Sequence, residues 1–84
     1  MSNITIYSTP VCPYCNRAKS LLEKKGQSWT EVDVSNDSER AKMIEKAGGR
    51  RTVPQIFIGD THVGGYDDLA ALEKEGKLDG LLAA

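Results

Sequence analysis

The chain has 84 residues, and 39% of these residues are hydrophobic. This length predicts one small domain that covers residues 1–84. Its formal net charge of −1 at pH 7 leaves no cationic surplus for nucleic acid or an anionic membrane surface. The N-terminus lacks the basic and apolar segments of a secretory signal, and no apolar run approaches the roughly 20 residues that span a bilayer. We therefore expect a cytoplasmic protein that binds neither nucleic acid nor membranes.

The first half of the chain predicts a strand, a helix and a second strand. Residues 4–7 alternate between apolar and polar side chains, which is typical of a half-buried strand. From Pro13 onward apolar residues recur at spacings of three and four, which indicates a helix with one buried face, and Gly26 suits its C-terminal end. A second strand is expected over residues 29–34. A β-α-β unit of this kind forms a right-handed crossover between parallel strands.

The second half predicts a helix, a hairpin and two further helices. The hairpin signal is Gly59-Asp60, a two-residue turn between short β-prone segments. The expected elements cover residues 35–47, 55–58, 61–63 and 67–75, and a short terminal helix around residues 78–82. The order β-α-β-α-β-β-α predicts an α/β protein with the thioredoxin-like fold, in which a four-stranded mixed sheet carries helices on both faces.

Cys12-Pro13-Tyr14-Cys15 lies where the first strand leads into the first helix, and it contains both cysteines of the chain. A structural zinc site would need four ligands, whereas only these two thiols and the distant His62 are offered. A structural disulfide across so short a loop would remove little entropy from the unfolded chain. Two inert buried cysteines are a further alternative. A redox-active dithiol is the interpretation that the position favours.

The position of the two thiols suggests different roles for them. Cys12 precedes the helix, where unpaired N–H groups and the positive end of the helix dipole stabilise an anion. The thiolate is the nucleophilic form of cysteine, and Pro13 is well suited to a first helical position. Cys15, one turn into the helix, is close enough to form the disulfide but has less access to solvent. We therefore predict that Cys12 attacks and Cys15 resolves.

Pro54, in Thr52-Val53-Pro54, precedes the predicted hairpin. Taken alone, a proline at this place more often opens an edge strand through a trans bond. A cis bond would instead turn the backbone of Val53 outward, so that its N–H and C=O groups could pair with an extended peptide. The sequence alone leaves both possibilities open.

Gly64-Gly65-Tyr66-Asp67-Asp68 leads into the third helix. The simplest interpretation is a break in the sheet followed by a helix cap. Small residues also let a ligand approach the backbone. Helix N–H groups could then bind a carboxylate, and Asp67 could bind an ammonium group.

Together these motifs resemble the glutaredoxin family, in its short bacterial dithiol form. The resemblance covers almost the whole chain and keeps the family's order and spacing. It rests on Cys12-Pro13-Tyr14-Cys15, Thr52-Val53-Pro54-Gln55-Ile56-Phe57 and Gly64-Gly65-Tyr66-Asp67-Asp68-Leu69. It implies a glutathione-dependent thiol–disulfide oxidoreductase that takes glutathione as co-substrate and holds neither a metal nor a tightly bound cofactor. Its partners would be glutathionylated or disulfide-containing proteins, with electrons from glutathione reductase through glutathione, and we expect a monomer.

The resemblance also implies a glutathione groove beside Cys12. Val53 would pair through its backbone with the cysteinyl part of glutathione, and Tyr14 would form one wall. The implied glutathione contacts are Tyr14, Thr52, Val53, Pro54, Gly65, Tyr66 and Asp67, the last three at the γ-glutamyl end. Cys12 would attack the mixed disulfide of a glutathionylated protein, and a second glutathione would release the enzyme. For a protein disulfide, Cys15 would resolve the intermediate instead.

The chain departs from the family pattern at two positions. Many members carry a lysine three residues before the first cysteine, where this chain has Thr9. Arg40, or less strongly Arg51, is then a candidate for the glycine carboxylate of glutathione, with surface solvation as the alternative role of either. Tyr66 stands where smaller residues are common, so its ring is expected to narrow the groove or stack on the ligand.

Two other functions remain open. One is a redoxin reduced by thioredoxin reductase, which would lack the full glutathione groove. The other is a 2Fe–2S carrier, in which Cys12 and glutathione would bind a cluster between two subunits. Outside the motifs, His62 is expected to face solvent on the hairpin, and Trp29 to pack at the edge of the core.

Overall fold

The computed structural model describes residues 3–83, which form four strands and four helices. Every predicted element is present, with bounds within two residues of those expected. The elements are β1 (Ile4–Ser8), α1 (Pro13–Lys24), β2 (Thr30–Asp33), α2 (Asp37–Lys46), β3 (Gln55–Ile58), β4 (Thr61–Gly64), α3 (Tyr66–Lys74) and α4 (Leu78–Ala83).

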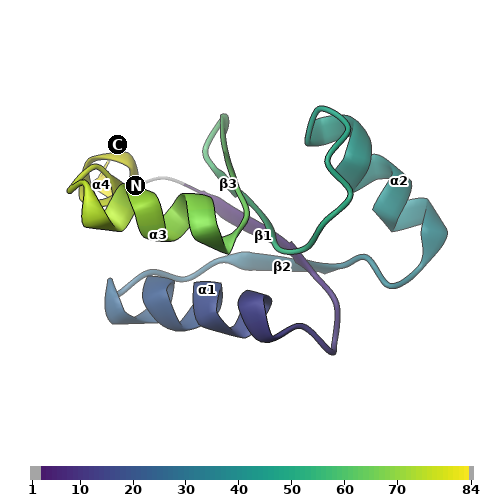
Figure 1. Ribbon diagram of the computed structural model, residues 1–84, viewed down its shortest axis with the longest axis horizontal. Helices are drawn as coiled ribbons and strands as arrows, with labels where there is room; N and C mark the ends of the chain where they lie inside the picture. Colours follow the sequence, from purple (N-terminus) through teal and green to yellow (C-terminus); the bar gives the residue numbers. More distant parts are fainter. Residues whose placement is uncertain (1–2, 84) are drawn as a thin grey trace.

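The four strands form one mixed sheet in the order β2-β1-β3-β4 (Figure 1). Strands β1 and β2 run parallel, with Thr5 opposite Thr30, as the predicted crossover through α1 requires. Strands β1 and β3 are antiparallel, and so are β3 and β4. The prediction of a four-stranded mixed sheet is therefore confirmed.

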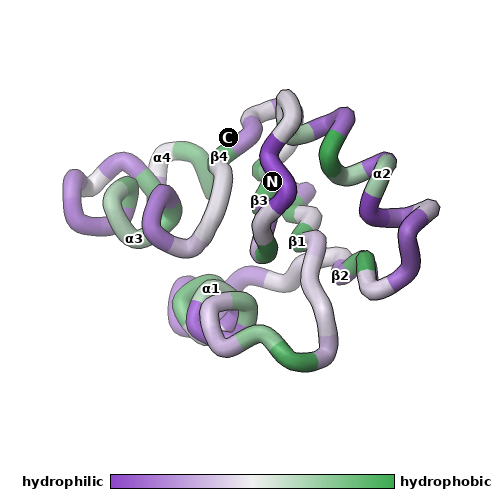
Figure 2. Tube along the Cα trace, turned by 45° about the vertical axis from the view of Figure 1, so that its right-hand side comes forward, coloured by the Kyte–Doolittle hydropathy of each residue, from purple (hydrophilic) through white to green (hydrophobic). Residues whose placement is uncertain are grey.

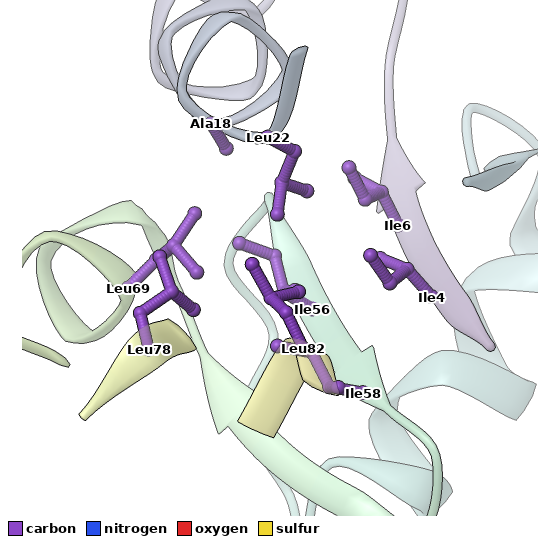
Figure 3. Close-up of a cluster of buried hydrophobic side chains, with 9 residues drawn as sticks. All are labelled: Ile4, Ile6, Ala18, Leu22, Ile56, Ile58, Leu69, Leu78 and Leu82. Atoms are coloured by element: carbon purple, nitrogen blue, oxygen red, sulfur yellow. The ribbon is translucent and has the colours of Figure 1, made fainter. Parts of the chain in front are cut away.

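One face of the sheet carries the main hydrophobic core (Figure 3). Alternate residues of a strand point to the same face, so β1 and β3 each contribute two isoleucines. Side chains of α1, α3 and α4 cover them, and Trp29 packs against the edge of the cluster as expected. The buried members are Ile4, Ile6, Ala18, Leu22, Ile56, Ile58, Leu69, Leu78 and Leu82.

Helix α2 covers the other face of the sheet, opposite α1 and α3 (Figure 2). Its Met43 is fully buried and belongs to a second cluster with Tyr7 and Val34. Phe57, from β3, packs against this cluster and meets the ring of Tyr7 edge-on at 5.7 Å between centroids. Helices therefore lie on both faces, which confirms the thioredoxin-like prediction.

Glycines with positive φ end two of the predicted elements. Gly26 follows α1 with φ of 72°, and its N–H donates to the carbonyl of Glu23 at 2.9 Å. Gly59, with φ of 59°, makes the turn between β3 and β4. Over residues 3–83, no helix combines the length and the hydropathy that crossing a bilayer requires.

Replacement of Leu22 by alanine tests the main core. The Leu22 side chain is fully buried between α1 and the sheet, so its loss leaves a cavity. We expect the free energy of unfolding, measured with urea, to fall by about 2–5 kcal/mol. Glu23→Ala, at the exposed neighbouring position, serves as the control. A Leu22→Ala protein as stable as this control would contradict the packing described.

Candidate active site

Cys12 is the N-cap residue of α1. Its backbone is extended, with φ of −150° and ψ of 98°, and Pro13 takes up the first turn of the helix. The N–H of Cys15 donates to the Sγ of Cys12 at 3.1 Å. No acidic residue lies in the first turn, so nothing there opposes a negative charge on the sulfur. The cap geometry thus favours a thiolate at Cys12 when the pair is reduced.

Cys12 and Cys15 form a disulfide, with 5.2 Å between their Cα atoms. The two residues differ in exposure: Cys12 retains 8% of its surface, whereas Cys15 is completely buried. A thiol or disulfide arriving from solvent therefore meets Cys12 first. This order of access agrees with the roles that the sequence suggests.

A hollow of about 250 Å³ opens beside Tyr14, two residues after Cys12. It brings together all seven residues for which the sequence implies glutathione contacts, and it adds two more that the sequence did not suggest. The lining consists of Tyr14, Arg50, Thr52, Val53, Pro54, Gly65, Tyr66, Asp67 and Asp68. These residues come from the starts of α1 and α3 and from the loop that precedes β3.

Two tyrosines face each other at the hollow. Tyr14 and Tyr66 lie in the first turns of α1 and α3, and their ring centroids are 6.3 Å apart at an interplanar angle of 32°. The guanidinium of Arg17 lies over the ring of Tyr14, 5.3 Å from its centroid. The N-termini of two helices therefore border one hollow, and their dipoles both favour an anionic ligand.

The loop residues Thr52 and Val53 line the hollow just before β3. The Val53–Pro54 peptide bond is cis, so of the two possibilities left open by the sequence the cis form is the one present. Within residues 3–83, no acceptor takes the N–H of Val53. Val53, whose side chain is half-buried, thus lines the hollow and has a backbone donor that is unpaired within residues 3–83.

Asp68 organises the start of α3. Its Oδ2 accepts the N–H of Gly65 at 2.9 Å and pairs with Nη1 of Arg50 at 3.1 Å. The hydrogen bond from Gly65, followed by the interaction with Arg50, holds the pKa of the Asp68 carboxyl below its usual range. Gly64, with φ of 113°, leaves room for this pair, because a Cβ there would collide with both the Asp68 and the Arg50 side chains.

Sequence reasoning missed Arg50 and Asp68, although signals for both were present. Asp68 lies three residues after the helix-capping Gly65, the position from which an acidic side chain reaches back to the cap. Arg50 lies two residues before Thr52, within the loop segment that carries the predicted Thr52-Val53-Pro54 contacts. The two arginines that were named instead, at positions 40 and 51, do not line the hollow; Nη2 of Arg40 donates to the backbone carbonyl of Arg51 at 2.9 Å.

The expectation for His62 was wrong. The side chain does not face solvent but is half-buried, with its ring stacked on Phe57 at 4.7 Å between centroids. Its Nε2 lies 2.7 Å from Oε1 of Gln55. The reason is the register of the hairpin, in which His62 is the cross-strand partner of Phe57 on the face covered by α2.

A thioredoxin-like fold with a Cys-x-x-Cys pair at the start of its first helix defines a thiol–disulfide oxidoreductase. Comparison with known proteins narrows this class. Residues 4–63 match the family model for glutaredoxin. Over 85 aligned residues the chain is 55% identical to the glutaredoxin of Pseudomonas aeruginosa, with full coverage of both proteins.

Solved structures agree with this match. The solution structure of glutaredoxin from Brucella melitensis superimposes with a TM-score of 0.85 at 58% identity, over 98% of this chain and 89% of that one. A crystal structure of a buckwheat glutaredoxin–glutathione complex gives a TM-score of 0.87 at 30% identity, over 98% and 77% of the two chains. The chain belongs to the glutaredoxin family, and it is a glutathione-dependent thiol–disulfide oxidoreductase.

The Asp68 carboxylate predicts a pH-dependent contribution to stability. Because its pKa is lower in the folded chain, this contribution is present above the unfolded pKa of about 3.9 and disappears as pH falls through the lower folded value. We expect Asp68→Asn to unfold at lower urea concentration than wild type at pH 7, and the difference in midpoint to shrink toward about pH 3. A difference that is constant or grows with acidity would contradict the assigned role.

Proposed function

We propose that this glutaredoxin reduces protein–glutathione mixed disulfides and protein disulfides, with Cys12 as the attacking and Cys15 as the resolving thiol. The observation that carries the proposal is the joint position of the dithiol and the hollow. Cys12 caps α1, and the hollow begins at Tyr14 in the first turn of the same helix. A ligand bound there would have its reacting sulfur close to the thiol that is accessible from solvent.

The backbone of Val53 would hold the cysteinyl part of glutathione. Val53 lines the hollow next to Thr52 and to the cis bond before Pro54, and its N–H has no acceptor within residues 3–83. A tripeptide in extended conformation can pair with such a segment in the manner of an added strand. These backbone hydrogen bonds would fix the position of the glutathione sulfur.

The start of α3 would hold the γ-glutamyl end, which carries one carboxylate and one ammonium group. The N–H of Gly65 is already bound by Asp68, so the carboxylate would take the next N–H groups, those of Tyr66 and Asp67. The exposed carboxylate of Asp67 would then pair with the ammonium group. Gly65 lines the same hollow and contributes through its backbone.

The proposed reaction exchanges one disulfide for another twice. The Cys12 thiolate attacks the glutathione sulfur of a mixed disulfide, a new S–S bond forms, and the substrate protein leaves as a thiolate that takes up a proton. The thiolate of a second glutathione attacks the sulfur of the bound glutathione, which forms oxidised glutathione and restores the Cys12 thiolate. The two electrons come from the glutathione pair. Protein disulfides follow the route through Cys15, and glutathione then reduces the Cys12–Cys15 disulfide.

The cellular setting is part of the proposal. Residues 1–84 would act as a single domain and a monomer in the cytoplasm, without a tightly bound cofactor. Glutathione reductase would return oxidised glutathione to its thiol form. The reducing glutathione pool of that compartment is what a dithiol of this kind needs for turnover.

Single serine variants test the two thiols. Cys12→Ser should lose all turnover of a glutathionylated peptide, because the attacking sulfur is gone. Cys15→Ser should keep that activity and lose reduction of a protein disulfide. The measurement is NADPH consumption coupled through glutathione and glutathione reductase. Equal loss of both activities in Cys15→Ser would contradict the division of roles.

Asp67→Asn tests the γ-glutamyl contact. Loss of the negative charge should raise the KM for a glutathionylated peptide by roughly three- to tenfold, because a charge-assisted hydrogen bond to the ammonium group is weakened. Asp60→Asn, in the exposed hairpin turn, is the matched control for the change in net charge. An unchanged KM in Asp67→Asn would count against the proposed orientation of glutathione.

A further inference from the structure

Gln55 is a fully buried polar side chain at the first position of β3. It lies on the strand face that also carries Phe57, the face covered by α2. A buried amide is costly unless its donors and acceptor are paired. Its hydrogen bonds therefore indicate what the residue is for, and none of the roles described above uses it.

The amide of Gln55 connects two separate parts of the structure. Its Nε2 lies 2.9 Å from the carbonyl oxygen of Thr52 and 3.2 Å from the Thr52 hydroxyl. Its Oε1 lies 2.7 Å from Nε2 of His62. A chain of hydrogen bonds thus runs from His62 on β4, through Gln55, to Thr52 in the wall of the hollow.

The direction of these bonds follows from the chemistry of the groups. A carbonyl oxygen only accepts, so the amide nitrogen of Gln55 must face Thr52. The amide oxygen must then face His62, and the imidazole must carry its proton on Nε2. The stack on Phe57 holds the ring in the plane that this donor needs. A His62 ring that donates from Nε2 therefore supports the orientation of the Gln55 amide that the Thr52 carbonyl requires.

The consequence for the hollow comes from the planarity of the peptide bond. The carbonyl of Thr52 and the N–H of Val53 belong to one peptide unit, and in a trans unit they point in opposite directions. The Thr52–Val53 bond is trans, since the cis bond in this segment is the next one. With the Thr52 carbonyl held inward by Gln55, the Val53 N–H points away from the interior. This is the donor that has no acceptor within residues 3–83.

We propose that Gln55 and His62 are positioning residues that together fix the Thr52–Val53 peptide plane and so aim the Val53 N–H at glutathione. The proposal rests on the proposed function, because it assigns to these residues the alignment of the glutathione-binding backbone. Neither residue lines the hollow. Their effect is on binding of the glutathionyl substrate and not on the chemistry of Cys12.

Two variants of His62 separate the hydrogen bond from the ring stack. His62→Phe keeps a ring against Phe57 but removes the donor to Gln55, so the KM for a glutathionylated peptide should rise about fivefold at unchanged kcat. His62→Gln loses the ring but can donate an amide N–H, so its KM should stay within about twofold of wild type. Thr61→Ala, at the exposed neighbouring position of β4, is the control. Gln55→Met is less suitable because it alters a fully buried position.

Urea unfolding of each variant accompanies the kinetics, so that KM values are compared among folded proteins. A wild-type KM in His62→Phe would overturn the proposal, and so would equal increases in His62→Phe and His62→Gln. The proposed function itself has a separate test on the wild-type enzyme. Equal activity on a glutathionylated peptide and on a matched mixed disulfide that lacks glutathione would refute it. The tautomer is tested independently of turnover: long-range ¹H–¹⁵N correlation should show the proton of the neutral His62 ring on Nε2, and a proton on Nδ1 would overturn the proposal.

Discussion

The active site depends on one local interaction, the hydrogen bond from the N–H of Cys15 to the sulfur of Cys12 at the start of α1. It makes a cysteine the cap of a helix, a place usually taken by Ser, Thr, Asp or Asn. A capping thiolate accepts the same hydrogen bond with a full negative charge, so the helix stabilises the reactive form of the residue. The burial of Cys15 in the same turn leaves Cys12 as the thiol that solvent can reach, which supports the proposed division of roles.

The fold provides a second helix N-terminus beside the first. Helices α1 and α3 share one face of the sheet, and both start near the loop that precedes β3 (Figure 1). The hollow lies among these three segments, so two helix dipoles and an unpaired backbone donor converge on it. This convergence matches the charge of glutathione, which carries two carboxylates, better than that of a neutral or cationic ligand.

Much of this arrangement could be predicted from the sequence, because its main determinants are local. The Cys12-Pro13-Tyr14-Cys15 motif fixes its own helix cap, and the hydrophobic periodicity of the strands predicts which face they bury. Features that depend on contacts between distant segments could not be predicted in this way. The Arg50–Asp68 pair joins the loop before β3 to α3, and the burial of His62 depends on its cross-strand partner.

The most direct test of the account is the relative reactivity of the two thiols in the reduced protein. Brief treatment with a limiting amount of iodoacetamide at mildly acidic pH, followed by digestion and mass spectrometry, measures how much of each cysteine is alkylated. Because only the thiolate reacts, the account predicts alkylation of Cys12 under conditions where an ordinary thiol barely reacts, with Cys15 left unmodified. Equal alkylation of the two residues, or preferential alkylation of Cys15, would contradict it.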